Sequence, residues 1–134
     1  MGLHDIYLPD EKTCAVSPEE YRENLDFIAG FLHKKFPQAK IFFALTTPVN
    51  EESQKSSPTY GRLVRRNTDV QKYNEIAREV MKAHGATVVD LHSFVTRDMI
   101  QADGIHLNKE AQQTVGTHVA EILKGALSSK SATE

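Results

Sequence analysis

Two short apolar runs, separated by a longer amphipathic stretch, constrain the fold more than any other feature of this chain. Residues 40–46 read KIFFALT, and residues 87–91 read TVVDL. A nearly continuous apolar run of this length is typical of a strand that is buried on both faces. A helix that connects two such strands crosses over with a right hand, so the sequence predicts neighbouring parallel strands.

Three stretches carry apolar residues at helical spacing. The first begins at Ser17, a helix cap that a proline and two glutamates follow, and it should stop before Pro37. The second begins at Asn67 and ends at Gly85, and the third begins after Asn108. The order helix, strand, helix, strand, helix predicts an α/β fold in three α/β/α layers around a parallel sheet.

The composition is typical of one soluble globular domain. Of 134 residues, 40% are hydrophobic and 25% charged, and we expect a single domain over 1–127 with a disordered tail over 128–134. A net charge of −2 gives no electrostatic footprint for nucleic acid or a membrane surface. No apolar run is long enough to span a membrane, and the single cysteine excludes an internal disulfide. The cellular compartment stays unknown at this stage.

A polar turn before the last helix carries residue types that catalysis uses. Asp103 and His106 lie three residues apart, and Gly104 separates them. A carboxylate at this spacing can orient an imidazole and stabilise its protonated form, as a general base requires. Ligands of open α/β sheets bind beyond the carboxyl ends of the strands, where we expect this turn to lie. The alternative is that both residues serve only as turn and cap residues.

Residues 50–66 are polar and contain few apolar side chains. This composition predicts a long loop that could act as a lid. Its arginines, Arg62, Arg65 and Arg66, either meet an anion or form a solvated basic surface.

Taken with the rest of the chain, two short motifs resemble blocks of the SGNH (GDSL-type) hydrolases. Residues 2–5 (GLHD) are similar to the third block of that family, Gly-x-Asn-Asp, and residues 103–106 (DGIH) to its fifth block, Asp-x-x-His. Connecting segments at 21–25, 46–49 and 73–77 are similar as well, so the resemblance covers nearly the whole chain. It implies a flavodoxin-like α/β/α fold with a five-stranded parallel sheet, and a serine esterase that needs no cofactor.

The resemblance also implies roles for individual residues. His106 would be the general base and Asp103 its orienting carboxylate. His4 stands where the family has an oxyanion-hole asparagine, and a neutral imidazole can donate one hydrogen bond there. Gly2 and Asp5 would flank it at the substrate, Asp5 as a structural carboxylate. The substrate would be a small-molecule ester.

The nucleophile of the family is the main departure from the pattern. The family's first two blocks, with the nucleophilic serine and an oxyanion glycine, precede the third block, and this chain begins one residue before that block. We therefore expect the carboxyl-terminal part of such a hydrolase, truncated at its N-terminus. Candidate substitute nucleophiles are Ser93, Ser57 and Ser56, whereas Cys14 is more simply a packing residue.

A sheet of two strands, or of three if residues before Leu8 add one, has an open edge and an uncovered face. Such a chain can cover them by pairing with another copy. We therefore expect a homo-oligomer, a dimer or higher, that covers the exposed sheet edge.

Three functions remain as hypotheses. The first is a carboxylic ester hydrolase whose activity is weak or depends on assembly. The second is a non-catalytic oligomeric remnant of such a hydrolase. The third is metal binding by His4, Asp5, Asp103 and His106 with His92 in reach, since these residue types can hold zinc. The family does not need a metal, so we predict none.

Overall fold

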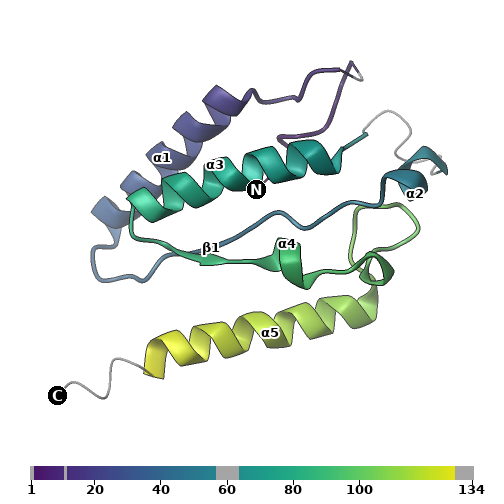
Figure 1. Cartoon of the computed structure of the whole chain (residues 1–134). Coiled ribbons are helices and arrows are strands. Elements are labelled where there is room, and N and C mark those ends of the chain that lie inside the picture. Colours follow the sequence, from purple (N-terminus) through teal and green to yellow (C-terminus); the bar gives the residue numbers. More distant parts are fainter. Residues whose placement is uncertain (1, 11, 57–63, 129–134) are drawn as a thin grey trace.

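The structure is a computed structural model, and it describes residues 2–10, 12–56 and 64–128. Helices and strands alternate along the chain in the expected order, with three short helical segments added (Figure 1). The elements are α1 (Pro18–Lys35), β1 (Phe42–Ala44), α2 (Glu51–Ser56), α3 (Asn67–Ala83), β2 (Thr87–Val89), α4 (Leu91–Phe94), the 3-10 helix η1 (Arg97–Met99) and α5 (Lys109–Ser128).

The two strands pair in parallel, as predicted. Phe42 lies opposite Thr87 and Ala44 opposite Val89. The ladder ends with hydrogen bonds from Leu45 N to the Val89 carbonyl (3.0 Å) and from Thr87 N to the Ile41 carbonyl (2.9 Å). Helices α1 and α3 lie on one side of the strands and α5 on the other (Figure 1). The chain is thus a mixed α/β protein with a small parallel sheet.

The strands are shorter and less buried than the apolar runs predict. Each contains three residues, and Ala44 is exposed. The reason lies in α5, which buries only Ala111 and Val115 at its N-terminal end. The rest of its apolar stripe, Val119, Ile122 and Leu123, is only half-buried. Helix α5 therefore covers its face of the strands only in part.

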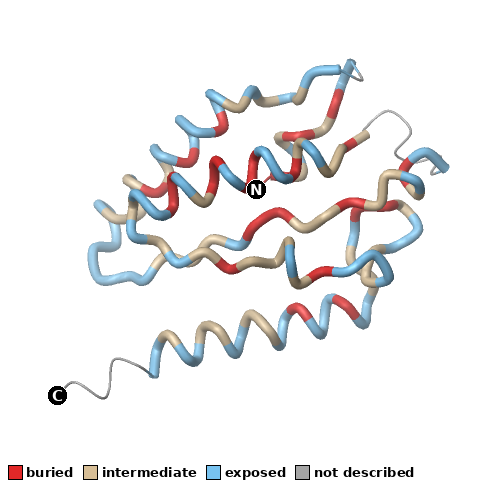
Figure 2. Tube along the Cα trace, in the orientation of Figure 1, coloured by how far each residue is buried: buried red, intermediate tan, exposed pale blue. Residues whose placement is uncertain are grey.

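The core lies between the strands and the α1–α3 pair (Figure 2). The rings of Tyr21 on α1 and Tyr73 on α3 pack with their centroids 4.9 Å apart. Around them the buried side chains are apolar: Ile6, Leu25, Ala29, Leu45, Val49, Val70, Ile76, Ala77, Val80 and Met81. Burial of these side chains is the dominant stabilising term for the fold.

Two of the three predicted helix caps are confirmed. The Ser17 hydroxyl accepts a hydrogen bond from Glu20 N (3.1 Å), and the Asn108 side chain accepts one from Ala111 N (2.8 Å). Asn67 is the first residue of α3 rather than its cap, which is Arg66. The Asn67 side chain instead binds a distant part of the backbone, as described below.

Residues 50–66 are not a continuous loop, because α2 begins at Glu51. Arg65 is buried, with 4% of its surface exposed. The hypothesis that it belongs to a solvated basic surface is therefore wrong. Arg62 and Ser57 lie outside the described residues.

The two ends of the described chain differ slightly from expectation. Residues before Leu8 form a turn and add no strand to the sheet. Helix α5 continues through Ser128, one residue into the predicted tail, and 129–134 lie outside the described residues. Within the described ranges, no helix is both long and apolar enough to cross a membrane.

Candidate active site

The turn that carries Asp103 and His106 is closed like a small hairpin. Ile100 and Leu107 form an antiparallel bridge at its base. Gln101 N donates to the His106 carbonyl (2.7 Å), and Gly104 N donates to the Gln101 carbonyl (2.9 Å). Since these bonds fix the backbone on both sides, the relative position of the two side chains is set before any substrate binds.

Asp103 and His106 form the contact that their spacing predicts. Asp103 Oδ2 lies 2.7 Å from His106 Nδ1. Asp103 Oδ1 accepts hydrogen bonds from Ile105 N (2.8 Å) and His106 N (3.0 Å). An ionised carboxylate only accepts, so Nδ1 carries the proton that it donates to Asp103. In the neutral ring the lone pair is then on Nε2, the tautomer that a general base needs.

The environment keeps Asp103 ionised. Burial raises the pKa of this carboxyl, but the backbone N–H groups of His106 and Ile105 and the His106 ring lower it by more, so the net pKa is below its usual value. The Asp103 side chain is 18% exposed, whereas that of His106 is 57% exposed. The carboxylate is thus sheltered behind an imidazole that solvent can reach.

Gly104 lets this turn sit against the start of α2. Its φ of +78° is in the left-handed region, and the Asn50 backbone N donates to its carbonyl (2.8 Å). A Cβ at this position would collide with the Asn50 carbonyl oxygen and would lie 2.8 Å from Gln54 Cγ. Only glycine therefore allows this close approach.

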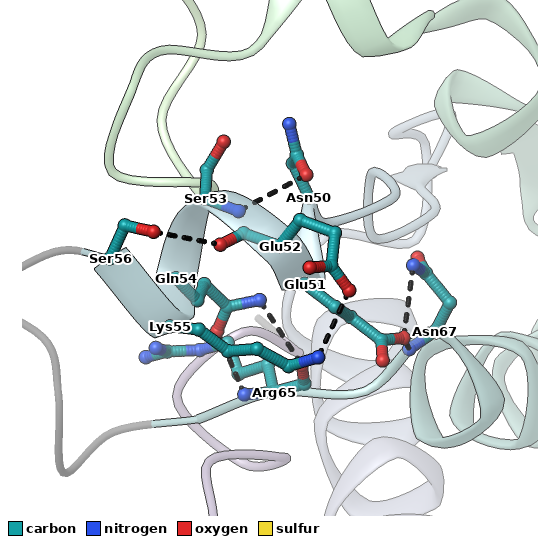
Figure 3. A network of polar contacts seen from close by, with 9 residues as sticks. All are labelled: Asn50, Glu51, Glu52, Ser53, Gln54, Lys55, Ser56, Arg65 and Asn67. Atoms are coloured by element: carbon teal, nitrogen blue, oxygen red, sulfur yellow. Dashed lines mark hydrogen bonds and ion pairs between the residues drawn. The ribbon is translucent and has the colours of Figure 1, made fainter.

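A chain of polar contacts runs from α2 to Arg65 (Figure 3) and from Arg65 to the 2–5 turn. The buried Gln54 amide donates to the Arg65 carbonyl (3.1 Å) and accepts from Arg65 N (2.9 Å). Arg65 Nε then donates to the Leu3 carbonyl (2.5 Å). The buried arginine therefore supports the backbone of the 2–5 turn, a role that its sequence context did not indicate.

The 2–5 turn holds the other candidate residues. Gly2 N donates to Asp5 Oδ2 (2.7 Å), and Asp5 N donates to the Gly2 carbonyl (3.0 Å). Gly2 has a φ of +112° and lies so close to Thr46 that a Cβ would overlap its side chain. Asp5 is therefore a structural carboxylate of this turn, and His4 is exposed beside it.

Both turns rest on the segment that follows β1. Gly2 lies against Thr46, and Gly104 lies against Asn50 and Gln54. The structure thus brings the two motifs to one segment at the carboxyl end of β1, the edge of the sheet where ligands of such folds bind.

Two asparagines hold this segment in place, a role that the sequence analysis assigned to neither of them. The buried Asn74 side chain accepts from Thr46 N and donates to the Thr46 carbonyl, both at 2.9 Å. Asn67 does the same for Val49, at 3.0 and 2.8 Å. Each amide replaces the strand partner that the backbone lacks beyond β1. The sequence did contain a signal for Asn74, because a polar amide there interrupts the apolar stripe of α3 next to Tyr73.

The two candidate nucleophiles that the structure describes, Ser93 and Ser56, form hydrogen bonds to residues other than His106. Ser93 is exposed, and its hydroxyl donates to Asp90 Oδ2 (2.9 Å). Ser56 is exposed at the end of α2 and makes only a long contact to the Glu52 carbonyl (3.5 Å). Neither hydroxyl is hydrogen-bonded to His106, and Ser57 lies outside the described residues.

Asp90, at the end of β2, is a strongly perturbed carboxyl group. Burial raises its pKa, but hydrogen bonds from Arg78 (2.8 Å) and from the Ser93 backbone and hydroxyl lower the pKa to about 2. This carboxylate caps α4 and pairs with Arg78 on α3, so its role here is structural.

The Asp90→Asn variant is expected to be less stable than wild type at neutral pH but equally stable at acid pH. Because the folded pKa (about 2) is below the unfolded value of about 3.9, ionised Asp90 stabilises the fold at neutral pH, and this contribution disappears as the pH falls from about 4 to 2. The side chain is 37% exposed, so we expect a difference of roughly 1 kcal/mol in the free energy of unfolding at neutral pH. Urea unfolding of both proteins across this pH range measures it. A difference that persists unchanged at the acid end would contradict this assignment.

The described part of the chain contains no cluster of side chains that would support the metal-binding hypothesis. Within it, no group of three or more His, Cys, Asp or Glu side chains is arranged to hold an ion. His92 lies on α4, where its Nε2 is buried and has no hydrogen-bond partner among the described residues.

Comparison with known proteins shows which family this chain belongs to. A sequence model of the GDSL-like lipase/acylhydrolase family matches residues 2–114, a range that includes both turns. The chain belongs to this family. Two plant proteins are similar to this chain over most of the chain's length. The GDSL esterase/lipase WDL1 of Oryza sativa subsp. japonica is 30% identical over 115 residues, which cover 81% of this chain and 44% of the rice protein.

The second plant relative and a solved structure show the same partial coverage. A GDSL esterase/lipase of Arabidopsis thaliana is 29% identical, with 92% of this chain and 56% of the relative covered. The crystal structure of a lipase/acylhydrolase from Enterococcus faecalis matches with a TM-score of 0.70 at 22% identity, covering 93% of this chain and 58% of that one. The mixed α/β structure of this chain therefore matches part of the fold of an SGNH lipase/acylhydrolase, and the chain spans about half the length of the plant relatives.

Proposed function

We propose that this chain supplies the general base of a carboxylic ester hydrolase, with His106 as the base and Asp103 as its orienting carboxylate. The observation that supports the proposal is the 2.7 Å contact between Asp103 Oδ2 and His106 Nδ1. It puts a basic Nε2 on an exposed ring at the carboxyl end of the sheet.

The chemistry proposed for this pair is acyl transfer to water. His106 Nε2 takes the proton of a serine hydroxyl while the oxygen attacks the ester carbonyl carbon, and ionised Asp103 stabilises the imidazolium that forms. The same proton then passes to the leaving alcohol as the C–O bond breaks. In the second half, His106 takes a proton from the water that attacks the acyl-serine. It returns this proton to the serine oxygen as the bond between that oxygen and the acyl carbon breaks, which releases the acid and restores both groups. Donors at the 2–5 turn, His4 among them, would hold the oxyanion.

The serine is the component that limits the expected activity. The hydroxyls of Ser93 and Ser56 are hydrogen-bonded to Asp90 and Glu52 rather than to His106, so we expect the isolated chain to be weakly active or to depend on assembly for activity. The arrangement of helices on both sides of the strands is consistent with part of a three-layer, flavodoxin-like α/β/α fold, which we propose for the assembled protein. Because neither Ser93 nor Ser56 is hydrogen-bonded to His106, we keep a non-catalytic remnant as the second candidate function.

Hydrolysis of p-nitrophenyl acetate by wild type and by His106→Ala distinguishes the two. Loss of a general base costs about a hundredfold or more, so an active chain should lose at least that factor in kcat/KM. The matched control is His118→Ala, since His118 stacks on Phe94 on another part of the molecule (ring centroids 3.9 Å apart) and should leave the rate unchanged. Equal slow rates in all three proteins would reject the hydrolase and support the remnant.

A further inference from the structure

We propose that Gln54 and Arg65 are positioning residues that hold the 2–5 turn and the 103–106 turn at a fixed spacing, and thus hold the proposed oxyanion donors relative to the proposed base. Three contacts make up this Gln54–Arg65 link, and they use no side chain that takes part in the proposed reaction. The role in catalysis rests on the proposed function, whereas the link itself can be tested without turnover.

The first contact of the link joins α2 to the 103–106 turn. Asn50, directly before α2, donates its backbone N–H to the Gly104 carbonyl (2.8 Å). Gln54 lies so close to Gly104 that a Cβ there would be 2.8 Å from Gln54 Cγ and 2.9 Å from Gln54 N. Figure 1 shows α2 beside the loop that precedes α5. A displacement of Gln54 therefore displaces the turn that carries the base.

The second contact fixes α2 to the segment before α3. The Gln54 amide donates to the Arg65 carbonyl (3.1 Å) and accepts from Arg65 N (2.9 Å), so it pairs with this backbone as a neighbouring strand would (Figure 3). The Glu51 carboxylate adds a hydrogen bond from Asn67 N (2.7 Å). Gln54 is only 1% exposed. A buried amide is costly unless it is hydrogen-bonded, so the side chain is held in one arrangement.

The third contact continues the link to the 2–5 turn. Arg65 Nε donates to the Leu3 carbonyl (2.5 Å). Because the guanidinium is charged, this hydrogen bond is stronger than one between neutral groups. The neighbouring Val64 carbonyl accepts from Leu8 N (3.0 Å), so the same segment holds the residues before α1 at two points.

These contacts complete a closed ring. Gly2 lies against Thr46, and the backbone of 46–50 leads from there to the first contact of the link. In a closed ring the two turns are connected on both sides, so neither can move alone while every contact is kept. Loss of the Gln54–Arg65 link opens the ring.

The spacing of the two turns affects the chemistry because both turns act on one carbonyl group. In the proposed reaction the base removes the proton of the nucleophile while the oxyanion forms at the 2–5 turn. A fixed spacing places both sets of groups before the substrate binds, and such preorganisation lowers the barrier.

The first test is amide hydrogen exchange of the full chain, followed by NMR. Arg65→Met keeps an unbranched stem and removes the side-chain donor. The amides to follow are Asp5 N, which is hydrogen-bonded within the 2–5 turn (3.0 Å), and Asn50 N, which is bonded to the other turn (2.8 Å). Relative to Thr87 N in the β1–β2 ladder, both should exchange at least about tenfold faster than in wild type, because a hydrogen bond from a charged group is lost.

Three further variants sharpen this test. Gln54→Met removes the other half of the link and should have the same effect on both amides. Arg65→Lys keeps the charge and the stem but lacks Nε, so it should give the same pattern with a smaller change, and it replaces Arg65→Met if that variant does not fold. The matched control is Arg22→Met, which removes an exposed ion pair with Glu79 and should change neither amide.

Two outcomes of the exchange experiment would overturn the proposal. Faster exchange at Asp5 N alone would show that Arg65 supports only its own turn. An equal acceleration of Thr87 N in both Arg65 variants would show a general loss of stability instead of a link between the turns. Since coupling is reciprocal, Gly104→Ala should also accelerate Asp5 N relative to Thr87 N.

Kinetics with p-nitrophenyl acetate connect the link to the reaction. Both side chains are buried and do not bind substrate, so Gln54→Met and Arg65→Met should leave KM nearly unchanged. A misplacement of about 1 Å can cost about a hundredfold in rate, so kcat should fall by roughly ten- to a hundredfold. An unchanged kcat in a chain whose hydrolysis depends on His106 would overturn the positioning role. Coupled exchange of both turns without any His106-dependent hydrolysis would instead reject the hydrolase and leave the link in place.

Discussion

Replacement of Gly104 by alanine is expected to destabilise the protein by about 2–5 kcal/mol. An L-residue at φ +78° costs roughly 1–2 kcal/mol, and forcing a methyl group into a packed site adds about 1–3 kcal/mol. The clash is with backbone atoms, the Asn50 carbonyl oxygen and Gln54 N (2.9 Å), which cannot rotate away as a flexible side chain can. Urea denaturation measures the loss in the free energy of unfolding.

Gly85→Ala is the control that separates strain from collision. Gly85 has a φ of +65°, but a Cβ there would meet nothing within 4 Å. This variant should therefore lose only the strain, roughly 1 kcal/mol. If both variants lose the same stability, the 103–106 turn does not depend on its close approach to Asn50. If Gly104→Ala still folds, the Asp103–His106 contact should loosen, and any esterase activity should fall with it.

Replacement of Asn74 by leucine is expected to cost about 2–5 kcal/mol of unfolding free energy. The Asn74 side chain, only 4% exposed, satisfies both backbone groups of Thr46. Loss of a buried hydrogen-bond partner costs about 1–3 kcal/mol, and a leucine side chain can replace neither of the two hydrogen bonds that Asn74 makes. The effect should exceed that of a typical substitution, which is about 1 kcal/mol.

The matched control for Asn74→Leu is Gln71→Leu, which exchanges an amide for the same apolar side chain at an exposed position of α3. That variant should change stability by no more than about 0.5 kcal/mol. Comparable losses in the two variants would show that the amide clamp on Thr46 contributes little. A selective loss in Asn74→Leu would identify α3 as the support for the segment on which both site turns rest.

Much of the fold could be predicted from local sequence. The apolar runs and the helical periodicities between them specify the order of elements, and the structure confirms the parallel pairing of Phe42–Ala44 with Thr87–Val89. Ser17 and Asn108 cap their helices as expected, since a cap depends on residues two or three positions away. The motif at 103–106 is local in the same sense: carboxylate and imidazole meet within one turn of the chain.

The extent of the strands was not predictable in this way. Their apolar runs continue past the residues that pair, and the exposure of Ala44 depends on how far α5 covers the strands. Periodicity reports which residues are apolar, but coverage depends on elements far away in the sequence.

The sequence by itself determined the order of helices and strands, their parallel arrangement, the family and the pairing of Asp103 with His106. The tertiary structure alone decided what holds that pair in place: Gly104 against Asn50, Gln54 on Arg65, and Asn74 on Thr46. It also decided that Arg65 is buried and that Asn67 holds Val49 rather than capping a helix. The physical reason is range. Propensities and caps act over a few residues, whereas each of these contacts satisfies a backbone group whose partner lies 11 to 50 or more residues away, and such a partner is selected only when the whole chain has folded.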